Sequence, residues 1–291
     1  MAQRVFYLYN RSLRPLSLAI AMLSEVRRLF VSEMAKVWRT KLPYIGLACS
    51  ALMAFVAKQS VESFATPGQV TAFNYFISSL ILSSTLTTPI FATIFAAMTV
   101  APETSRGTLR TILVRPVTRS QFLIAKLLSA VLYLVLLEVA NALIAAMVAQ
   151  KYPLNEAIDS SLDVPPLATQ FVVCLTGLAL ALIPQLATVA FGFMISVLVT
   201  SGGTAVGIAL GLYLTVTAAK QFISIAGYEL SQFIFSTYYD LPLKIADAKI
   251  GGMYEAWFQE RTLYMFSTSL IALVAFLAVS FWLFLRRDLN Y

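Results

Sequence analysis

Long apolar runs separated by short charged segments dominate the pattern of residues along this chain. The clearest run extends from Leu263 to Leu285 without a charged residue and is followed by Arg286 and Arg287. A helix needs about 20 mostly apolar residues to cross the core of a bilayer, so each such run predicts a transmembrane helix. The pattern predicts six spans: Leu42–Ala57, Phe73–Val100, Phe122–Val148, Leu167–Val199, Gly203–Ala219 and Leu263–Leu285.

Two of the predicted spans contain a proline, which cannot donate a helical hydrogen bond. Pro89 lies inside the second span and Pro184 lies inside the fourth. The fourth run is also longer than one straight crossing needs. Pro184 therefore predicts a kink or a break in that span.

The composition agrees with a membrane protein, since 59% of the 291 residues are hydrophobic and only 12% are charged. Both cysteines, Cys49 and Cys174, lie inside predicted spans, where a free cysteine behaves as a small apolar residue. The sequence predicts an all-α membrane protein with no soluble catalytic domain. We expect a cytoplasmic N-terminal segment at 1–41 and a six-span transmembrane domain at 42–291, whose outer segment covers 221–262.

Lys and Arg residues gather in the N-terminal segment, in the link between the second and third spans, and after the sixth span. Short segments on the cytoplasmic side carry such an excess. Six spans place both termini on one side, so we expect both in the cytoplasm and the protein in the cell (inner or cytoplasmic) membrane. The net charge of +7 then follows from topology. No nucleic-acid partner is expected, because no segment outside the spans is large enough for a basic groove.

The segment before the first span has the spacing of an amphipathic helix. Its apolar residues recur at steps of three and four, at Leu23, Val26, Phe30, Met34 and Val37. Charged and polar residues fall largely on the opposite face. Such a helix either lies flat in the cytoplasmic interface of the membrane or packs on the cytoplasmic surface of the protein itself, and the first placement is favoured.

The link between the second and third spans predicts a short helix. Pro102 suits the first helical position and Glu103 the first turn, where negative charge favours the helix dipole. The residue before a proline leaves the helical region, so Pro116 predicts an end near Val114 or Arg115.

The third span begins with a signal of its own. Thr118 and Gln121 have the T-x-x-Q spacing of a capping box, in which each residue satisfies a backbone N–H of the other. The link is therefore predicted to be a compact helix on the cytoplasmic face, joined closely to the second and third spans.

At these residues the chain resembles the permease subunits of ABC transporters of the type-2 family, which includes many antibiotic, peptide and polysaccharide exporters. The family pattern has a Glu after the second span, then Gly-Thr, then Pro-x-Ser/Thr-Arg leading into the third span. The matching residues are Glu103, Gly107, Thr108, Pro116, Val117, Thr118 and Arg119, followed by Phe122 and Lys126. Glu33 before the first span and the Arg-Arg-Asp sequence after the last one add to the resemblance. The motif covers about 25 residues, whereas the architecture covers nearly the whole chain.

The resemblance implies a subunit that is not itself an enzyme and binds no cofactor directly. ATP and Mg would be used by a partner ABC ATPase subunit, and the membrane part would include a second copy of this permease or a homologous permease. Membrane lipid is a further expected partner, and an extracytoplasmic protein is a possible one. The residues expected to couple the chain to the ATPase are Glu103, Arg106, Gly107, Thr108, Arg110, Arg115, Pro116 and Arg119.

The residues agree that energy must come from elsewhere. A P-loop needs a Gly-Lys pair to hold phosphates, and the sequence contains none. It also contains no histidine, which excludes a Ser-His-Asp triad and His-ligated zinc. The glycine-rich stretch from Ser201 to Thr204 is predicted to be the turn between the fourth and fifth spans.

Polar residues inside the spans give a second candidate site, because an intramembrane carboxylate is costly and usually functional. The candidates for a transport pathway are Glu138, Asn141, Ser83, Ser84 and Thr87. A structural role is the alternative. Glu138 would then bond Asn141 on the same helix face, and the hydroxyls would bond their own helix, a neighbouring helix or carbonyls freed near the proline of the second span.

The aromatic-rich segment 221–262 predicts short helices on or in the outer leaflet, forming a lid and offering a contact for lipid or an extracytoplasmic partner. Three functions stay open. The favoured function is an export permease; the alternatives are a mechanical transmitter that drives an extracytoplasmic partner and a channel or scaffold that works without an ATPase.

Overall fold

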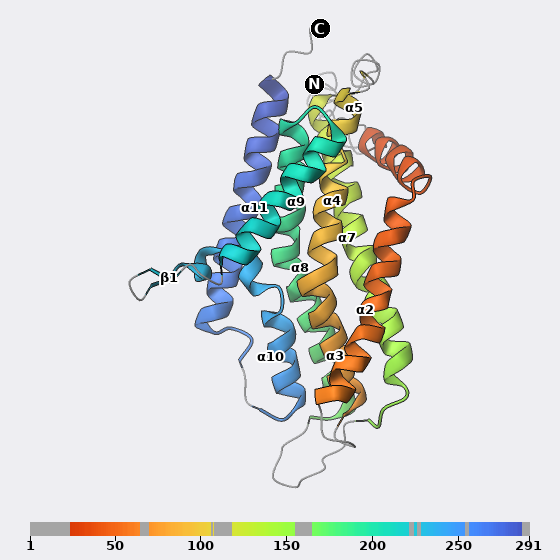
Figure 1. The fold of residues 1–291 in the computed structure, drawn as a ribbon, viewed down its shortest axis with the longest axis vertical. Helices are drawn as coiled ribbons and strands as arrows, with labels where there is room; N and C mark the ends of the chain where they lie inside the picture. Colours follow the sequence, from red (N-terminus) through yellow and green to blue (C-terminus); the bar gives the residue numbers. More distant parts are fainter. Residues whose placement is uncertain are drawn as a thin grey trace, which may run out of the picture.

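Six long helices lie side by side along the long axis of the molecule (Figure 1). The computed structural model describes residues 24–64, 70–105, 107, 118–154, 165–220, 224–225, 228–253 and 256–286. The helical stretches long and apolar enough to cross a membrane are Leu42–Ser63, Ala72–Ser105, Arg119–Ala149, Leu167–Leu198, Gly202–Ala219 and Glu260–Arg286. They confirm the six predicted spans, and the chain is a multi-pass membrane protein.

The elements follow the sequence with few interruptions. Residues 24–37 form a helix before the first span. The helices after it are α2 (Leu42–Phe64), α3 (Ala72–Leu82), α4 (Thr88–Ala97), α5 (Ala101–Ser105), α7 (Arg119–Ala149), α8 (Leu167–Leu198), α9 (Gly202–Ala219), α10 (Leu241–Ile250) and α11 (Glu260–Arg286). A π-helix, η1 (Ser83–Thr87), joins α3 to α4, and two 3-10 helices, η2 (Leu230–Phe233) and η3 (Phe235–Tyr238), precede α10. Two-residue strands, β1 (Ser224–Ile225) and β2 (Tyr228–Glu229), pair antiparallel.

The first and fourth spans differ in detail from the prediction. The first helix continues to Phe64 instead of ending at Ala57, and Lys58 pairs with Glu62 one turn later at 3.8 Å. The fourth span is one continuous helix with Pro184 inside it, so of the two predicted alternatives the break is wrong, and the kink stays a prediction. Helix α8 packs against α4, α7, α10 and α11, and Pro184 is among its buried residues.

The second span is interrupted where hydroxyl residues precede a proline. The π-helix η1 ends one residue before α4, and Pro89 lies in the first turn of α4, where its missing N–H costs little. A π-helix widens the hydrogen-bonding ladder of an α-helix and often marks a functional position. The second span is therefore two α-helices joined by a widened turn.

The helix that begins the link after the second span ends earlier than predicted. Helix α5 ends at Ser105, and Gly107 has a φ of 67°, the left-handed conformation that ends a right-handed helix. One continuous helix reaching Val114 is therefore wrong, and residues 108–117 lie outside the described part. The predicted capping box is confirmed, with Thr118 and Gln121 each accepting the backbone N–H of the other.

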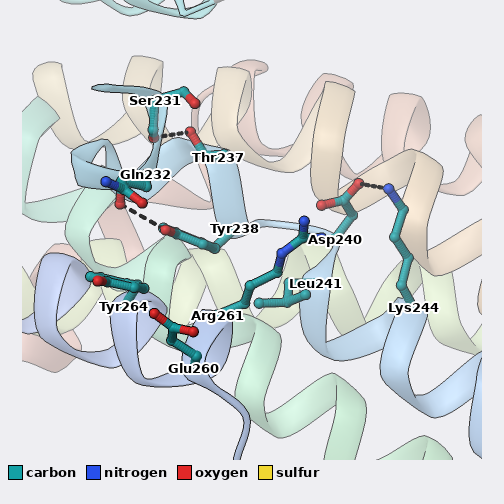
Figure 2. Close-up of a pocket in the computed structure, with 10 residues that line it drawn as sticks. All are labelled: Ser231, Gln232, Thr237, Tyr238, Asp240, Leu241, Lys244, Glu260, Arg261 and Tyr264. Carbon is teal, nitrogen blue, oxygen red and sulfur yellow. Dashed lines mark hydrogen bonds and ion pairs between the residues drawn. The ribbon is translucent and has the colours of Figure 1, made fainter. Parts of the chain in front are cut away.

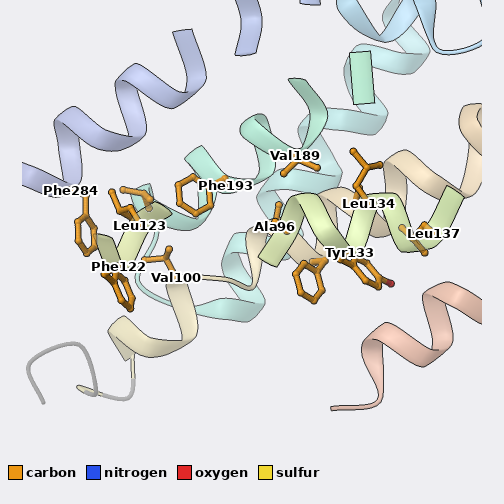
Figure 3. Packing of buried hydrophobic residues seen from close by; sticks show 14 residues of the cluster. Ala96, Val100, Phe122, Leu123, Tyr133, Leu134, Leu137, Val189, Phe193 and Phe284 are labelled. Carbon is orange, nitrogen blue, oxygen red and sulfur yellow. The ribbon is translucent and has the colours of Figure 1, made fainter. Parts of the chain in front are cut away.

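The largest apolar core lies between α4, α7 and α8, with a contribution from α11 (Figure 3). Phe95 and Tyr133 stack with their ring centroids 4.3 Å apart, and Phe122 stacks on Phe284 at 5.8 Å. Helices α4 and α8 cross so closely at Gly192 that an added Cβ atom would lie 2.8 Å from a carbonyl oxygen of α4. This core holds the second, third and fourth spans together as one packed unit.

The segment predicted to lie outside contains short helices, as expected, and its position on a leaflet stays a prediction. Helix α10 packs against α3 and α8. Gly177 of α8 faces Ala246, and the Asn74 amide donates to the carboxylate of Asp247 at 3.2 Å. In Figure 1, α10 lies at the end of the bundle opposite to α5.

Candidate functional site: a charged cluster beside the link

Four charged side chains from three segments meet at one end of the bundle, and we call them the charged cluster. Glu33 and Lys36 come from helix 24–37, Glu103 from α5, and Lys126 from α7. Figure 1 shows helix 24–37, in red, at the same end of the molecule as α5. The charged cluster thus joins the segment before the first span to the second and third spans.

Each cation of the charged cluster contacts both carboxylates. Lys126 Nζ lies 2.6 Å from Glu33 Oε2 and 2.7 Å from Glu103 Oε1. Lys36 Nζ lies 2.6 Å from Glu33 Oε1 and 3.1 Å from Glu103 Oε1. The side chain of Lys126 is only 4% exposed, whereas that of Lys36 is 54% exposed. The inner half of the cluster is therefore closed to water.

The ion pairs together outweigh the effect of burial on the pKa values of Glu33 and Lys36. Burial raises the pKa of Glu33, but Lys126 and Lys36 outweigh it, so the pKa lies below its ordinary value. Burial lowers the pKa of Lys36, but Glu33 and Glu103 outweigh it, and the pKa is raised. Both residues stay charged at neutral pH. Removing one partner from such a buried pair typically costs about 3–5 kcal/mol.

Two further helices hold α5 in place. The hydroxyl of Ser196 in α8 accepts hydrogen bonds from the backbone N–H groups of Val100 and Ala101, at 2.9 and 3.0 Å. Gly202 at the start of α9 lies so close to Pro102 that an added Cβ atom would be 2.8 Å from its ring. Helix α5 is therefore fixed by α7, α8, α9 and helix 24–37 together.

The predicted coupling residues divide into three groups. Glu103 belongs to the charged cluster, so its carboxylate acts mainly through ion pairs and not as an exposed charge at a helix end. Gly107 is exposed, with open space where a Cβ atom would be. Arg119 donates to the carbonyl oxygen of Leu285 at 3.0 Å and so joins the start of α7 to the last turn of α11. Outside the described residues lie Arg106, Thr108, Arg110, Arg115 and Pro116.

Sequence reasoning missed the contacts of the charged cluster. Glu33 and Lys126 supported the resemblance, but nothing in the sequence placed them within 3 Å of each other. Lys126 carried a usable signal, because a lysine inside a predicted span needs a partner. Lys36, one helical turn after Glu33, and Ser196 had no such signal.

A second group of polar residues lies inside the bundle around η1. Glu138 of α7 is 2% exposed and accepts a hydrogen bond from the Ser84 hydroxyl at 2.9 Å. The Gln185 amide of α8 donates to the Ser84 carbonyl oxygen at 2.7 Å. A side chain of α8 thus satisfies a carbonyl group in the widened turn of the second span. Ser84 is the link between the two polar side chains.

Most of the predicted pathway residues form hydrogen bonds within or between helices, as the structural alternative expects. The predicted bond between Glu138 and Asn141 is wrong. Asn141 bonds Ser79, not Glu138: the Ser79 hydroxyl donates to its amide oxygen, and its amide donates to the Ser79 carbonyl oxygen, both at 3.2 Å. The Ser83 hydroxyl lies 3.0 Å from that of Ser50 and 3.1 Å from that of Thr87. All five candidates are at most 9% exposed. A pathway along them therefore requires the second, third and fourth spans to separate.

A family model described as "Protein of unknown function (DUF2705)" matches residues 45–290. The chain belongs to the DUF2705 family. No curated protein matches it. The match includes Glu103 and Lys126 of the charged cluster, whereas Glu33 and Lys36 precede it.

The pH dependence of stability tests the charged cluster in this DUF2705 protein. Because the pKa of Glu33 is lower in the folded protein than in the unfolded chain, its contribution is complete above the ordinary value of 4.5 and is lost as the pH falls through the folded value. At pH 7 we expect Glu33→Gln to lower the melting temperature in detergent by roughly 5 °C or more. The difference from the wild type should shrink below about pH 4.5.

Glu25→Gln is the matched control, since Glu25 lies on the same helix in an exposed pair with Arg28. Such a pair contributes about 0–1 kcal/mol, so the control should change little. A Glu33→Gln effect of the same size at pH 7 and pH 4 would mean that the carboxylate is not held by these ion pairs.

Proposed function

We propose that this DUF2705 protein is the membrane subunit of an ATP-binding-cassette exporter, powered by a separate ATPase subunit. The observation that supports this best is the charged cluster, because it connects the segments on both sides of the 106–117 link. The resemblance to type-2 permeases gives this link its function. An ATPase that pushes or pulls on the link would move α5 and α7 together.

The packing gives such a movement a route into the membrane. Helix α5 follows α4 after a turn of three residues, and both α4 and α7 belong to the main core with α8. Glu138, Ser84 and Gln185 join α7, η1 and α8 further along the same helices. A displacement at the link would therefore strain the polar contacts around η1. Opening them would expose Glu138 to a substrate, which is the transport role proposed for it.

The type-2 resemblance also implies two permease subunits, and α9 provides the surface on which we expect them to meet. Gly203, Gly207 and Gly211 recur every four residues, and all three are exposed with open space at the Cβ position. Small residues at this spacing allow close packing of membrane helices. Only 17% of the residues of α9 are buried within one chain.

We expect Gly207→Leu to shift the purified protein from dimer toward monomer, because the larger side chain separates the two helices. Light scattering in mild detergent and cysteine cross-linking along α9 measure this. Val216→Leu adds bulk at another exposed position of α9 and should leave the dimer intact. An unchanged mass for Gly207→Leu would remove α9 from the interface.

The proposal is tested by purifying the tagged full chain in mild detergent and identifying its partners by mass spectrometry. We expect an ABC ATPase subunit that hydrolyses ATP in the complex and stays bound through size-exclusion chromatography. A complex that also contains an extracytoplasmic protein and drives no transport in vesicles would favour mechanical transmission. Purification of an intact chain without any ATPase would favour a channel or scaffold and reject the proposal.

A further inference from the structure

A polar cavity of about 460 Å³ lies between the segment after α9 and the start of α11 (Figure 2). Its walls come from η2, η3, the start of α10 and the first turns of α11. The lining residues are Ser231, Gln232, Thr237, Tyr238, Asp240, Leu241, Lys244, Glu260, Arg261 and Tyr264. Nine of the ten side chains, all except that of Leu241, are polar or charged, so the cavity is built for a polar ligand.

Some of the polar groups in the cavity are already used. Asp240 pairs with Lys244 at 2.7 Å. The hydroxyl of Thr237 donates to the carbonyl oxygen of Ser231 at 2.8 Å, and that of Tyr238 donates to the carbonyl oxygen of Gln232 at 2.7 Å. These bonds fix the wall formed by η2 and η3. They leave the ligand to be recognised by the opposite wall, which is the start of α11.

That wall presents one free charge of each sign. Glu260 and Arg261 are adjacent and exposed, and neither forms an ion pair with another described residue. In Figure 2 the Arg261 side chain extends from α11 into the space between Glu260 and Asp240. With Asp240 neutralised by Lys244, the cavity has no net charge. A ligand with one negative and one positive group matches the charges of Glu260 and Arg261, whereas a simple anion would leave the Glu260 carboxylate without a partner in the cavity.

The surroundings of the cavity indicate a lipid as the source of this ligand. Glu260 and Arg261 are the first residues of the sixth span, where a bilayer's polar head groups would lie. The exposed apolar residues Leu263, Leu270 and Ile271 continue along α11 from the same point. The side chain of Phe258, which is 73% exposed, lies just before the span. A head group in the cavity would therefore leave its acyl chains beside an apolar helix surface.

We propose that this cavity binds the phosphoethanolamine head group of a zwitterionic phospholipid, with the phosphate at Arg261 and the ammonium group at Glu260. Arginine pairs well with phosphate oxygens, and the ammonium group can donate hydrogen bonds to a carboxylate. The ammonium group of phosphocholine has no N–H to donate, and phosphoglycerol has no cation, so both bind less tightly. The site does not depend on the proposed transport function.

The test uses the full chain in mild detergent, incubated with equal amounts of phosphatidylethanolamine, phosphatidylcholine and phosphatidylglycerol, and native mass spectrometry of the bound lipid. We expect phosphatidylethanolamine to be retained several-fold more than the other two. Arg261→Gln should reduce retention of all three lipids by fivefold or more. Glu260→Gln should keep phospholipid binding but abolish the preference for phosphatidylethanolamine over phosphatidylglycerol.

Arg286→Gln is the control, because it removes the same charge from the other end of α11, outside this cavity. The proposal would be overturned if the amount of retained lipid did not depend on its head group, or if it fell equally in Arg261→Gln and Arg286→Gln. Soluble phosphoethanolamine distinguishes the source of the head group. Weak displacement of the lipid at millimolar concentration supports a lipid site, whereas binding as tight as that of the lipid would overturn it in favour of a soluble zwitterion.

Discussion

Replacing Lys126 with methionine should be the most damaging single change in the charged cluster. The carboxylates of Glu33 and Glu103 would lose their shared, buried cation. Only the half-exposed Lys36 would remain between them. Methionine fills a similar volume, so the cost is electrostatic. We expect the free energy of unfolding to fall by about 3–5 kcal/mol. Denaturant or thermal unfolding of the purified protein in detergent measures it.

A double-mutant cycle separates the ion pair from other effects of the substitution. Adding Glu33→Gln to Lys126→Met removes one of the two facing carboxylates, so the double variant should be more stable than the sum of the single effects predicts. Lys58→Met is the control, since Lys58 pairs with Glu62 at an exposed site and should contribute about 0–1 kcal/mol. Equal losses from Lys126→Met and Lys58→Met would contradict the buried network.

Replacing Gly107 with leucine should abolish coupling without unfolding the protein. Gly107 is exposed and has a left-handed conformation, which costs an L residue roughly 1–2 kcal/mol. A Cβ atom added at Gly107 would meet no other atom of the described chain within 4 Å. The loss of stability is therefore local. The substitution changes the direction of the chain in the link just after α5. We expect the variant to insert and dimerise normally but to lose ATP-driven transport by at least tenfold.

Gly107→Asn is the matched control, because asparagine tolerates the left-handed conformation better than other residues. It should keep most of the activity. Glu103→Lys is a poorer test of coupling, since it would add a third cation to the charged cluster and destabilise the fold as well. Normal ATP-driven activity in Gly107→Leu would show that the link does not depend on this turn.

The spans and their ends were accessible from the sequence because they depend on local properties. Hydrophobic length predicted all six spans, and the spacing of Thr118 and Gln121 predicted a capping box that the structure contains. The end of the link helix was predicted too late in the sequence, because Gly107 suits a helix end as well as a flexible interior position. Only its backbone conformation shows which of these it is.

The candidate sites were less accessible because their partners are distant in the sequence. Glu138 was matched with Asn141, the polar residue one turn away, but its partner is Ser84 in another span. Lys126 contacts Glu33, a residue 93 positions earlier. The π-helix is stabilised by Gln185 from the fourth span, and no pattern within the second span indicates that contact. Such pairings are set by how the helices cross, which hydrophobic periodicity does not define.

The central claim, that an ABC ATPase acts at the 106–117 link, is tested most directly by site-specific photo-cross-linking in cells. A photoreactive amino acid at Ser105, exposed at the end of α5, should form a cross-link to a subunit with a P-loop, identified by mass spectrometry. The same group at Lys151, exposed just after the other end of α7, should give no such product. An ATPase cross-link at Lys151, or its absence at Ser105 while the probe there reacts with other proteins, would contradict the proposed function.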